Sequence, residues 1–176
     1  MGINVELQKV TSELISEVYA FCAEVVERFA REVVSTEDDS RGGGAVAMLL
    51  PEESQGGKVI GVVSEADQLR FVSNAVNKNN AMHKHGVILS EKAADTTATP
   101  PIYGGGISPQ DGVYFSFSGF PPAWDQAFCL MVAECFDIIT PQRVNSIIEQ
   151  SSNPLEARVY YQEARFFMVH YILHIG

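Results

Sequence analysis

Two histidines near the end of the chain, His170 and His174, have the spacing of side chains on one face of a helix. Glu163 lies seven residues before His170, on the same stripe. Two imidazoles and a carboxylate on one face are a ligand set for zinc or iron, so they predict a candidate metal site and a metal-dependent enzyme. The general-base glutamate of HExxH enzymes is missing, because Tyr171 stands there. The alternative is a partly buried structural pair of histidines.

A second histidine pair, His83 and His85, occurs in the run HKH. In a strand the two rings would point the same way and could share a metal, whereas at a helix end they would diverge. No carboxylate or cysteine accompanies them in ligand spacing. The sequence therefore favours a polar helix end, where positive charge complements the helix dipole.

A third candidate site lies between the loop IYGGGISPQDG and the segment VYFSFSGFPPAWDQAF. The three glycines do not form GxGxxG before a helix, and SFSG lacks the first glycine of GxSxG, so neither a dinucleotide fingerprint nor a nucleophile elbow is predicted. The backbone N–H groups of residues 119 to 124 form a small nest that could hold a carboxylate, unless Asp125 satisfies those donors itself. Trp124 either lines an apolar pocket or packs in the core.

Composition excludes several classes of partner. The chain has 176 residues, 46% of them hydrophobic and 19% charged, which is typical of globular proteins. A formal net charge of -10 repels phosphate groups, so neither nucleic acid nor an anionic membrane is expected as a partner. We find no signal peptide and no apolar run of roughly 18 residues that could cross a bilayer. Three cysteines without CxxC spacing predict reduced thiols in a cytoplasmic protein, with Cys129 and Cys135 buried and inert.

The elements that position these residues follow from periodicity. Apolar steps of three and four predict a helix over 6–34, and a second helix over 64–85 with Leu69, Val72, Ala75 and Val76 on one face. Glycines 42–44 are expected to be a flexible link, the runs 45–51 and 58–63 a hairpin, and 113–119 a strand. A further strand could be hidden in HGVILS or in IYGGGIS, the latter within a predicted loop. Helices are predicted over 122–139, from Thr140-Pro141 to Ile148, and after Asn153-Pro154.

These elements predict an α+β fold in which an antiparallel sheet is flanked by helices. We expect a single domain over 1–176. It would contain an N-terminal helix over 6–34, a sheet-and-helix core over 45–139 and a C-terminal helical extension over 140–176.

Several dipeptides in residues 91–128 resemble the haem-degrading HbpS-like family. They are Lys92-Ala93, Gly105-Gly106, Asp111-Gly112, Ser118-Gly119 and Asp125-Gln126. The resemblance implies a profilin-like α/β/α sandwich of order α–β–β–α–β–β–α, here with extra C-terminal helices. It also implies a small-molecule site with haem as the ligand, and the nest described above adds a small carboxylate as a second candidate.

The function expected from the sequence is therefore small-molecule binding by a homo-oligomeric, profilin-like domain. The predicted ligand-binding residues are Gly104, Gly105, Gly106, Ser118, Gly119, Trp124 and Asp125. The alternatives are the metal-dependent enzyme and a non-catalytic assembly protein. In the assembly protein, subunits would meet through the N-terminal helix and the C-terminal aromatics Tyr160, Tyr161, Phe166, Phe167 and Tyr171.

Overall fold

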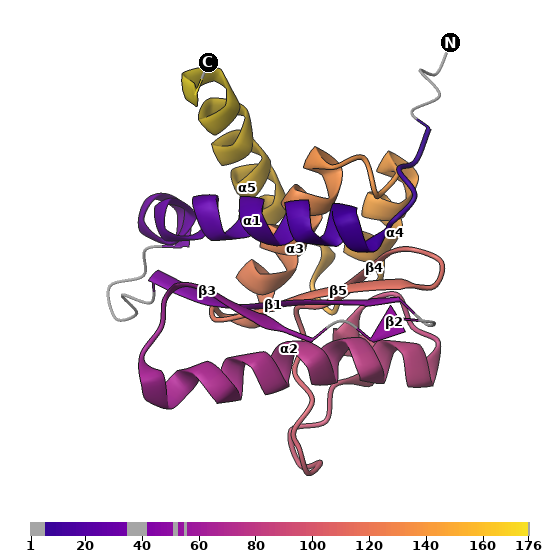
Figure 1. The fold of residues 1–176 in the computed structure, drawn as a ribbon. Helices are drawn as coiled ribbons and strands as arrows, with labels where there is room; N and C mark the ends of the chain where they lie inside the picture. The colour runs from indigo at the N-terminus through magenta and orange to yellow at the C-terminus, as the bar shows by residue number, and fades with distance from the viewer. Residues whose placement is uncertain (1–5, 35–41, 51–52, 55, 176) are drawn as a thin grey trace.

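A five-stranded antiparallel sheet lies at the centre of the computed structural model, which describes residues 6–34, 42–50, 53–54 and 56–175 (Figure 1). The strand order is β2-β1-β5-β4, and β3 also pairs with β1. The strands are β1 (Gly42–Leu50), β2 (Glu53–Ser54), β3 (Lys58–Val62), β4 (Ile107–Gln110) and β5 (Val113–Ser118).

Helices cover both faces of the sheet, as the sequence predicted for an α+β fold. The helix α2 (Glu65–His85) packs on one face, and α1 (Ser12–Phe29) and α3 (Pro122–Cys135) pack on the other (Figure 1). The helices α4 (Pro141–Gln150) and α5 (Pro154–Ile175) follow, and α5 packs against α3. Two short elements, the π-helical η1 (Ala30–Val34) and the 3₁₀-helical η2 (Ser90–Ala93), complete the order.

The helix boundaries follow local capping. The first helix begins at Ser12 rather than at residue 6, because the Thr11 side chain accepts from the Leu14 N–H at 3.2 Å and ends the preceding extended segment. The predicted cap at Thr140 is confirmed by its bond from the Arg143 N–H. The helix α3 ends at Cys135 instead of the predicted residue 139. Two residues after Cys135, Asp137 adopts a left-handed φ of 54°, which stops the helix from continuing.

Two loop predictions were wrong. Gly42–Gly44 is not a flexible link but the start of β1, where a side chain on Gly44 would meet Phe117 and Ser118 of the neighbouring strand. Residues 107–110 form β4, which overlaps the hidden strand considered within IYGGGIS only at Ile107 and Ser108. It joins β5 through the turn at Asp111-Gly112, and Gly112 has a φ of 76°.

The buried face of α2 also differs from the prediction. Leu69, expected on that face, is 77% exposed, whereas Ala75, also expected there, is buried together with Phe71 and Met82. Lys78 and Asn79 lie on the same buried face. The helix therefore brings polar groups under the sheet, which the count of apolar residues alone did not predict.

Aromatic packing connects the C-terminal helices to the rest of the fold. The Phe29 ring at the end of α1 contacts Trp124 and Phe128 of α3, and its centroid lies 5.2 Å from that of Phe167 in α5. One hydrophobic cluster accordingly includes residues of α1, the sheet, α3, α4 and α5. Within the described residues no helix is long and apolar enough to cross a membrane.

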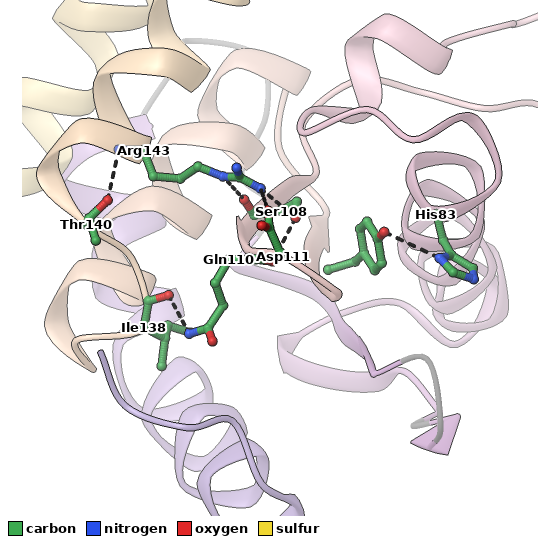
Figure 2. A network of polar contacts seen from close by, with 8 residues as sticks. His83, Ser108, Gln110, Asp111, Ile138, Thr140 and Arg143 are labelled. Carbon is green, nitrogen blue, oxygen red and sulfur yellow. Dashed lines mark hydrogen bonds and ion pairs between the residues drawn. The ribbon is translucent and has the colours of Figure 1, made fainter. Parts of the chain in front are cut away.

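Polar contacts connect α4 to the β4–β5 hairpin (Figure 2). The Arg143 guanidinium donates to the Ser108 carbonyl at 3.0 Å and lies 3.4 Å from the Asp111 carboxylate. The Gln110 side chain donates to the Ile138 carbonyl at 2.9 Å. These bonds fix the hairpin against the segment between α3 and α4.

Candidate functional site

A buried ion pair lies behind the predicted site. The Lys78 Nζ of α2 is 2.9 Å from the Asp125 Oδ2 of α3 and donates to the Phe117 carbonyl at 2.7 Å. The two side chains are 1% and 3% exposed. The pairing of β4 with β5 extends only as far as Phe115, so Phe117 lies beyond the partner strand, and its carbonyl accepts from the lysine instead.

Asp125 also occupies the backbone nest that the sequence predicted. Its Oδ1 accepts from the Phe120 N–H at 2.9 Å. Burial raises the pKa of Asp125 to about 6, while Lys78 and the amides of Phe120 and Gly119 act in the opposite direction. Asp125 therefore satisfies the backbone N–H groups of the nest itself, which is one of the two alternatives considered from the sequence. An external carboxylate would have to displace the Asp125 side chain.

A second set of buried polar contacts runs from α2 through the sheet. The Asn79 amide nitrogen donates to the Ala47 carbonyl of β1, and its oxygen accepts from the Ser116 hydroxyl of β5 at 2.6 Å. The Ser90 hydroxyl accepts from the Gly106 N–H at 2.7 Å. The Asn79 bonds join α2 to the sheet, and the Ser90 bond holds the end of the glycine loop (Gly104–Gly106) to η2.

The loop passes close to α3 at Gly105. Gly105 has a φ of 104°, and a Cβ added to it would lie 2.6 Å from the Asp125 Cβ and 2.9 Å from the Pro122 carbonyl oxygen. Only glycine fits this conformation and this space. The loop can therefore contact the start of α3 closely while leaving its outer side open.

That outer side forms the wall of a cavity of about 270 Å³, which we call the loop–helix pocket. The pocket lies between the glycine loop, η2, the start of α3 and the turn that joins α4 to α5. Its lining residues are Glu91, Gly104, Gly105, Pro122, Ala123, Gln126, Ser151, Ser152, Asn153, Glu156 and Ala157. This volume is close to the lower end of the range for small-molecule sites.

Of the seven predicted ligand-binding residues, only Gly104 and Gly105 line this pocket. Asp125, Ser118 and Trp124 are buried. The Trp124 ring lies 4.3 Å from that of Tyr160 and packs in the core, which is the alternative the sequence left open. Gly106 and Gly119 contribute backbone amides to the internal contacts rather than to the pocket wall.

The predicted metal ligands are not gathered into a site. Within the residues that the structure describes, no group of three or more His, Cys, Asp or Glu side chains is placed to hold a metal ion. His174 and His170 have ring centroids 5.8 Å apart, and the His174 Nδ1 lies 2.7 Å from the His170 carbonyl oxygen. Glu163 and His170 instead line a groove of about 520 Å³ between η1 and α5.

The pair His83 and His85 lies in the last turn of α2, as expected for a polar helix end. The His83 Nδ1 is 3.3 Å from the Tyr114 hydroxyl. Among the cysteines, Cys22 and Cys129 are buried, but Cys135 is exposed, which corrects the prediction that it is buried. It stands at the last position of α3, where the helix leaves the core.

Lys78, Asn79 and Ser116 were not predicted as part of any site. A signal for Lys78 was present, because residues 71, 75, 78 and 82 follow helical spacing and place the lysine among apolar neighbours. No comparable pattern identifies Glu91 or Ser152, since they reach the pocket from separate segments.

Comparison with known proteins gives no relative for this chain: no family model, no curated protein and no solved structure matches it.

Proposed function

We propose that this protein binds a small polar ligand in the loop–helix pocket. The observation that carries the proposal is the enclosure of the pocket by four separate segments around the glycine loop that the sequence predicted as a ligand site. Residues far apart in the sequence that converge on one concave surface, with a small number of polar side chains among them, are typical of a small-molecule site. The internal contacts of Asp125 and Ser90 would keep the loop in place without ligand.

The ligand is proposed to be neutral or cationic, with hydrogen-bond donors, such as a small amine or polyol. Two carboxylates line the pocket, and each already accepts a hydrogen bond. Glu91 accepts from the Ser152 N–H at 2.8 Å and Glu156 accepts from the Asn153 amide at 3.1 Å. They leave further acceptor positions open and repel anions.

The starts of α3 and α5 also offer little to an anion. The Asn153 side chain accepts from the Glu156 N–H, and its carbonyl accepts from the Ala157 N–H. Asp125 accepts from the amides just before α3. With these donors occupied, the usual attraction of helix N-termini for carboxylates is weakened, which disfavours the small carboxylate considered from the sequence.

Haem, the ligand implied by the resemblance, is also disfavoured in this pocket. The residues that line it include no His, Cys, Met or Tyr, which are the side chains that usually ligate haem iron. We retain a profilin-like, HbpS-like fold as part of the proposal. The order α1, β1, β3, α2, β4, β5, α3 supports it, since it repeats α–β–β–α–β–β–α once the two-residue β2 and the short η1 and η2 are set aside. A cytoplasmic location is proposed as well, supported by three free thiols.

Ligand binding is tested by thermal shift and calorimetry against four sets of compounds: small amines, polyols, small carboxylates and haemin. Amines or polyols should raise the melting temperature. For an amine, Glu156→Gln should weaken binding by about tenfold, because it removes one charge but retains the side chain's size. The matched control is Glu149→Gln, an exposed carboxylate of α4 outside the pocket.

Two outcomes would contradict the proposal. The first is no change in melting temperature with any of the four sets. The second is binding of an amine, a carboxylate or haemin with equal affinity in the native chain, Glu156→Gln and Glu91→Gln, which would place the ligand elsewhere.

A further inference from the structure

The helix α5 presents an apolar stripe to solvent. The residues Leu155, Val159, Gln162, Phe166, Val169 and Leu173 follow one another in alternating steps of four and three, and we call them the α5 seam. The five apolar members are between 51% and 82% exposed. Alternating steps of this kind are the pattern of the a and d positions in a two-stranded coiled coil, and Gln162 is then the one polar residue in the seam.

The opposite side of α5 is buried against the rest of its own chain. Tyr161, Ala164, Met168 and Tyr171 are buried in the core of their own chain, and α5 packs on α3. The helix is thus held in place without a partner, so pairing through the seam would not have to order it. The seam spans 19 residues, a rise of about 27 Å along the helix, which is short for an isolated coiled coil but sufficient for a helix already formed.

The charged residues beside the seam indicate which helix could pack on it and in which orientation. Glu156, Glu163 and His170 occupy the e positions on one side, while Arg158, Arg165 and Ile172 occupy the g positions on the other. In a parallel pair each g residue faces the e residue five positions later on the partner. The dimer would then contain two such ion pairs, because the Arg158 of each copy faces the Glu163 of the other. In an antiparallel pair e faces e and g faces g, so no arginine of these positions would face a glutamate.

We propose that the α5 seam binds the α5 seam of a second copy of this chain, in parallel, about a two-fold axis. The pattern is self-complementary, as an isologous interface requires. The two arginines are available for it, because their contacts within the chain are long: 3.4 Å from Arg158 to Asn145 and 3.7 Å from Arg165 to Glu134.

The groove between η1 and α5 continues the same surface. It shares Val159, Gln162 and Phe166 with the seam and adds Glu163 and Glu32 at its wall. Glu32 is paired with Arg28 at 2.7 Å, whereas Glu163 has no ion pair within the part of the chain that the structure describes. The partner's Arg158 would lie next to this carboxylate, which supports a basic residue of a second copy as the neighbour.

This inference refines the subunit contact expected from the sequence. Of the aromatics considered there, Tyr161, Phe167 and Tyr171 are buried within the chain, whereas Phe166 is 67% exposed. The seam shares no residue with the lining of the loop–helix pocket, although Glu156 lines that pocket and also lies beside the seam.

Light scattering and sedimentation over a concentration series test the pairing. The full chain should be a dimer, and Phe166→Glu should weaken the dimer by more than ~100-fold, because two carboxylates would be buried against each other. Leu69→Glu, at a residue that is 77% exposed on α2, is the control and should leave the mass unchanged. A monomer at every concentration, or a dimer that survives Phe166→Glu, would overturn the proposal.

Orientation is tested by crosslinking in a Cys135→Ser background, which removes the exposed native thiol. Val169→Cys should form a disulfide-linked dimer under mild oxidation, since a parallel pair places both copies of residue 169 together. Leu69→Cys should not. Arg158→Glu should weaken the dimer by about tenfold, and Arg158→Glu with Glu163→Arg should restore it. A dimer that does not link at residue 169, or that the double reversal fails to restore, would exclude the parallel arrangement.

Discussion

Lys78 and Asp125 are joined by a buried ion pair although they belong to helices on opposite faces of the sheet. The lysine side chain passes the end of β5, where its Nζ is 2.9 Å from the carboxylate and 2.7 Å from the Phe117 carbonyl. The same carboxylate holds the backbone just before α3. The ion pair therefore connects α2, the end of β5 and the segment just before α3, which lies next to the glycine loop.

Removing one partner of this pair should destabilise the protein strongly. Lys78→Met is expected to lower the free energy of unfolding by about 3–5 kcal/mol at neutral pH, because it leaves a buried carboxylate without its cation. Urea unfolding followed by circular dichroism measures the loss. Lys84→Met, at an exposed lysine of the same helix, should change stability by less than about 0.5 kcal/mol.

The pair can be isolated from other effects with a double-mutant cycle. Lys78→Met with Asp125→Asn should be less destabilising than the sum of the two single changes, by about 1–3 kcal/mol. Additive effects would mean that the two charges do not interact in solution.

Stability should depend on pH through Asp125. Its pKa is raised to about 6 in the folded chain from an ordinary value of 3.8, so the folded state binds the proton more tightly than the unfolded state. Its contribution is therefore fully present below 3.8 and is lost as the pH rises through about 6. The stability of the native chain relative to Asp125→Asn should fall by about 3 kcal/mol over that interval.

Denaturant unfolding of the native chain and of Asp125→Asn at closely spaced pH values measures the difference between their free energies of unfolding. Taking the difference cancels the titration of the other carboxyl groups. A difference that rises with pH between 4 and 6 would show that Lys78 lowers the pKa of Asp125 by more than burial raises it.

Gly105→Ala should destabilise the glycine loop. The added Cβ would lie 2.6 Å from the Asp125 Cβ, and the backbone has a φ of 104°, so both crowding and strain oppose it. We expect a loss of about 2–4 kcal/mol. Gly86→Ala is the matched control, because Gly86 also has a positive φ, of 63°, but nothing lies within 4 Å of its added Cβ, so about 1 kcal/mol is expected there. Equal losses at the two positions would mean that the close contact with Asp125 is not present in solution.

Much of the fold could be predicted because helix caps and apolar periodicity are local signals. The Thr140 cap, the strands around 45–51, 58–63 and 113–119, and the last three helices follow from them. The start of β1 could not be predicted in this way. Glycines 42–44 are typical of a link, and only the neighbouring strands explain why they are paired and why Gly44 excludes a side chain.

The candidate site was less predictable, since it depends on contacts between distant segments. Gly104 and Gly105 were identified, but Glu91 lies beside them in η2, and Asn153 reaches the same pocket only because α4 and α5 follow α3 and return to this side. Asp125 was correctly placed at the start of a helix, yet its partner Lys78 lies 47 residues away in the sequence. A lysine on an apolar stripe indicates that a buried partner is needed, without indicating which carboxylate supplies it.

Thiol reactivity provides a last prediction. Burial raises the pKa of Cys22 and of Cys129, so neither thiol should react in the folded protein. Cys135 is exposed, and desolvation together with the Asp137 and Glu134 carboxylates raises its pKa, so it should react more slowly than a free cysteine. Titration with Ellman's reagent at pH 8 should therefore detect one thiol in the native chain, none in Cys135→Ser, and three in denaturant. Reaction of a second thiol at a comparable rate in the native chain would mean that the core containing Cys22 and Cys129 opens readily.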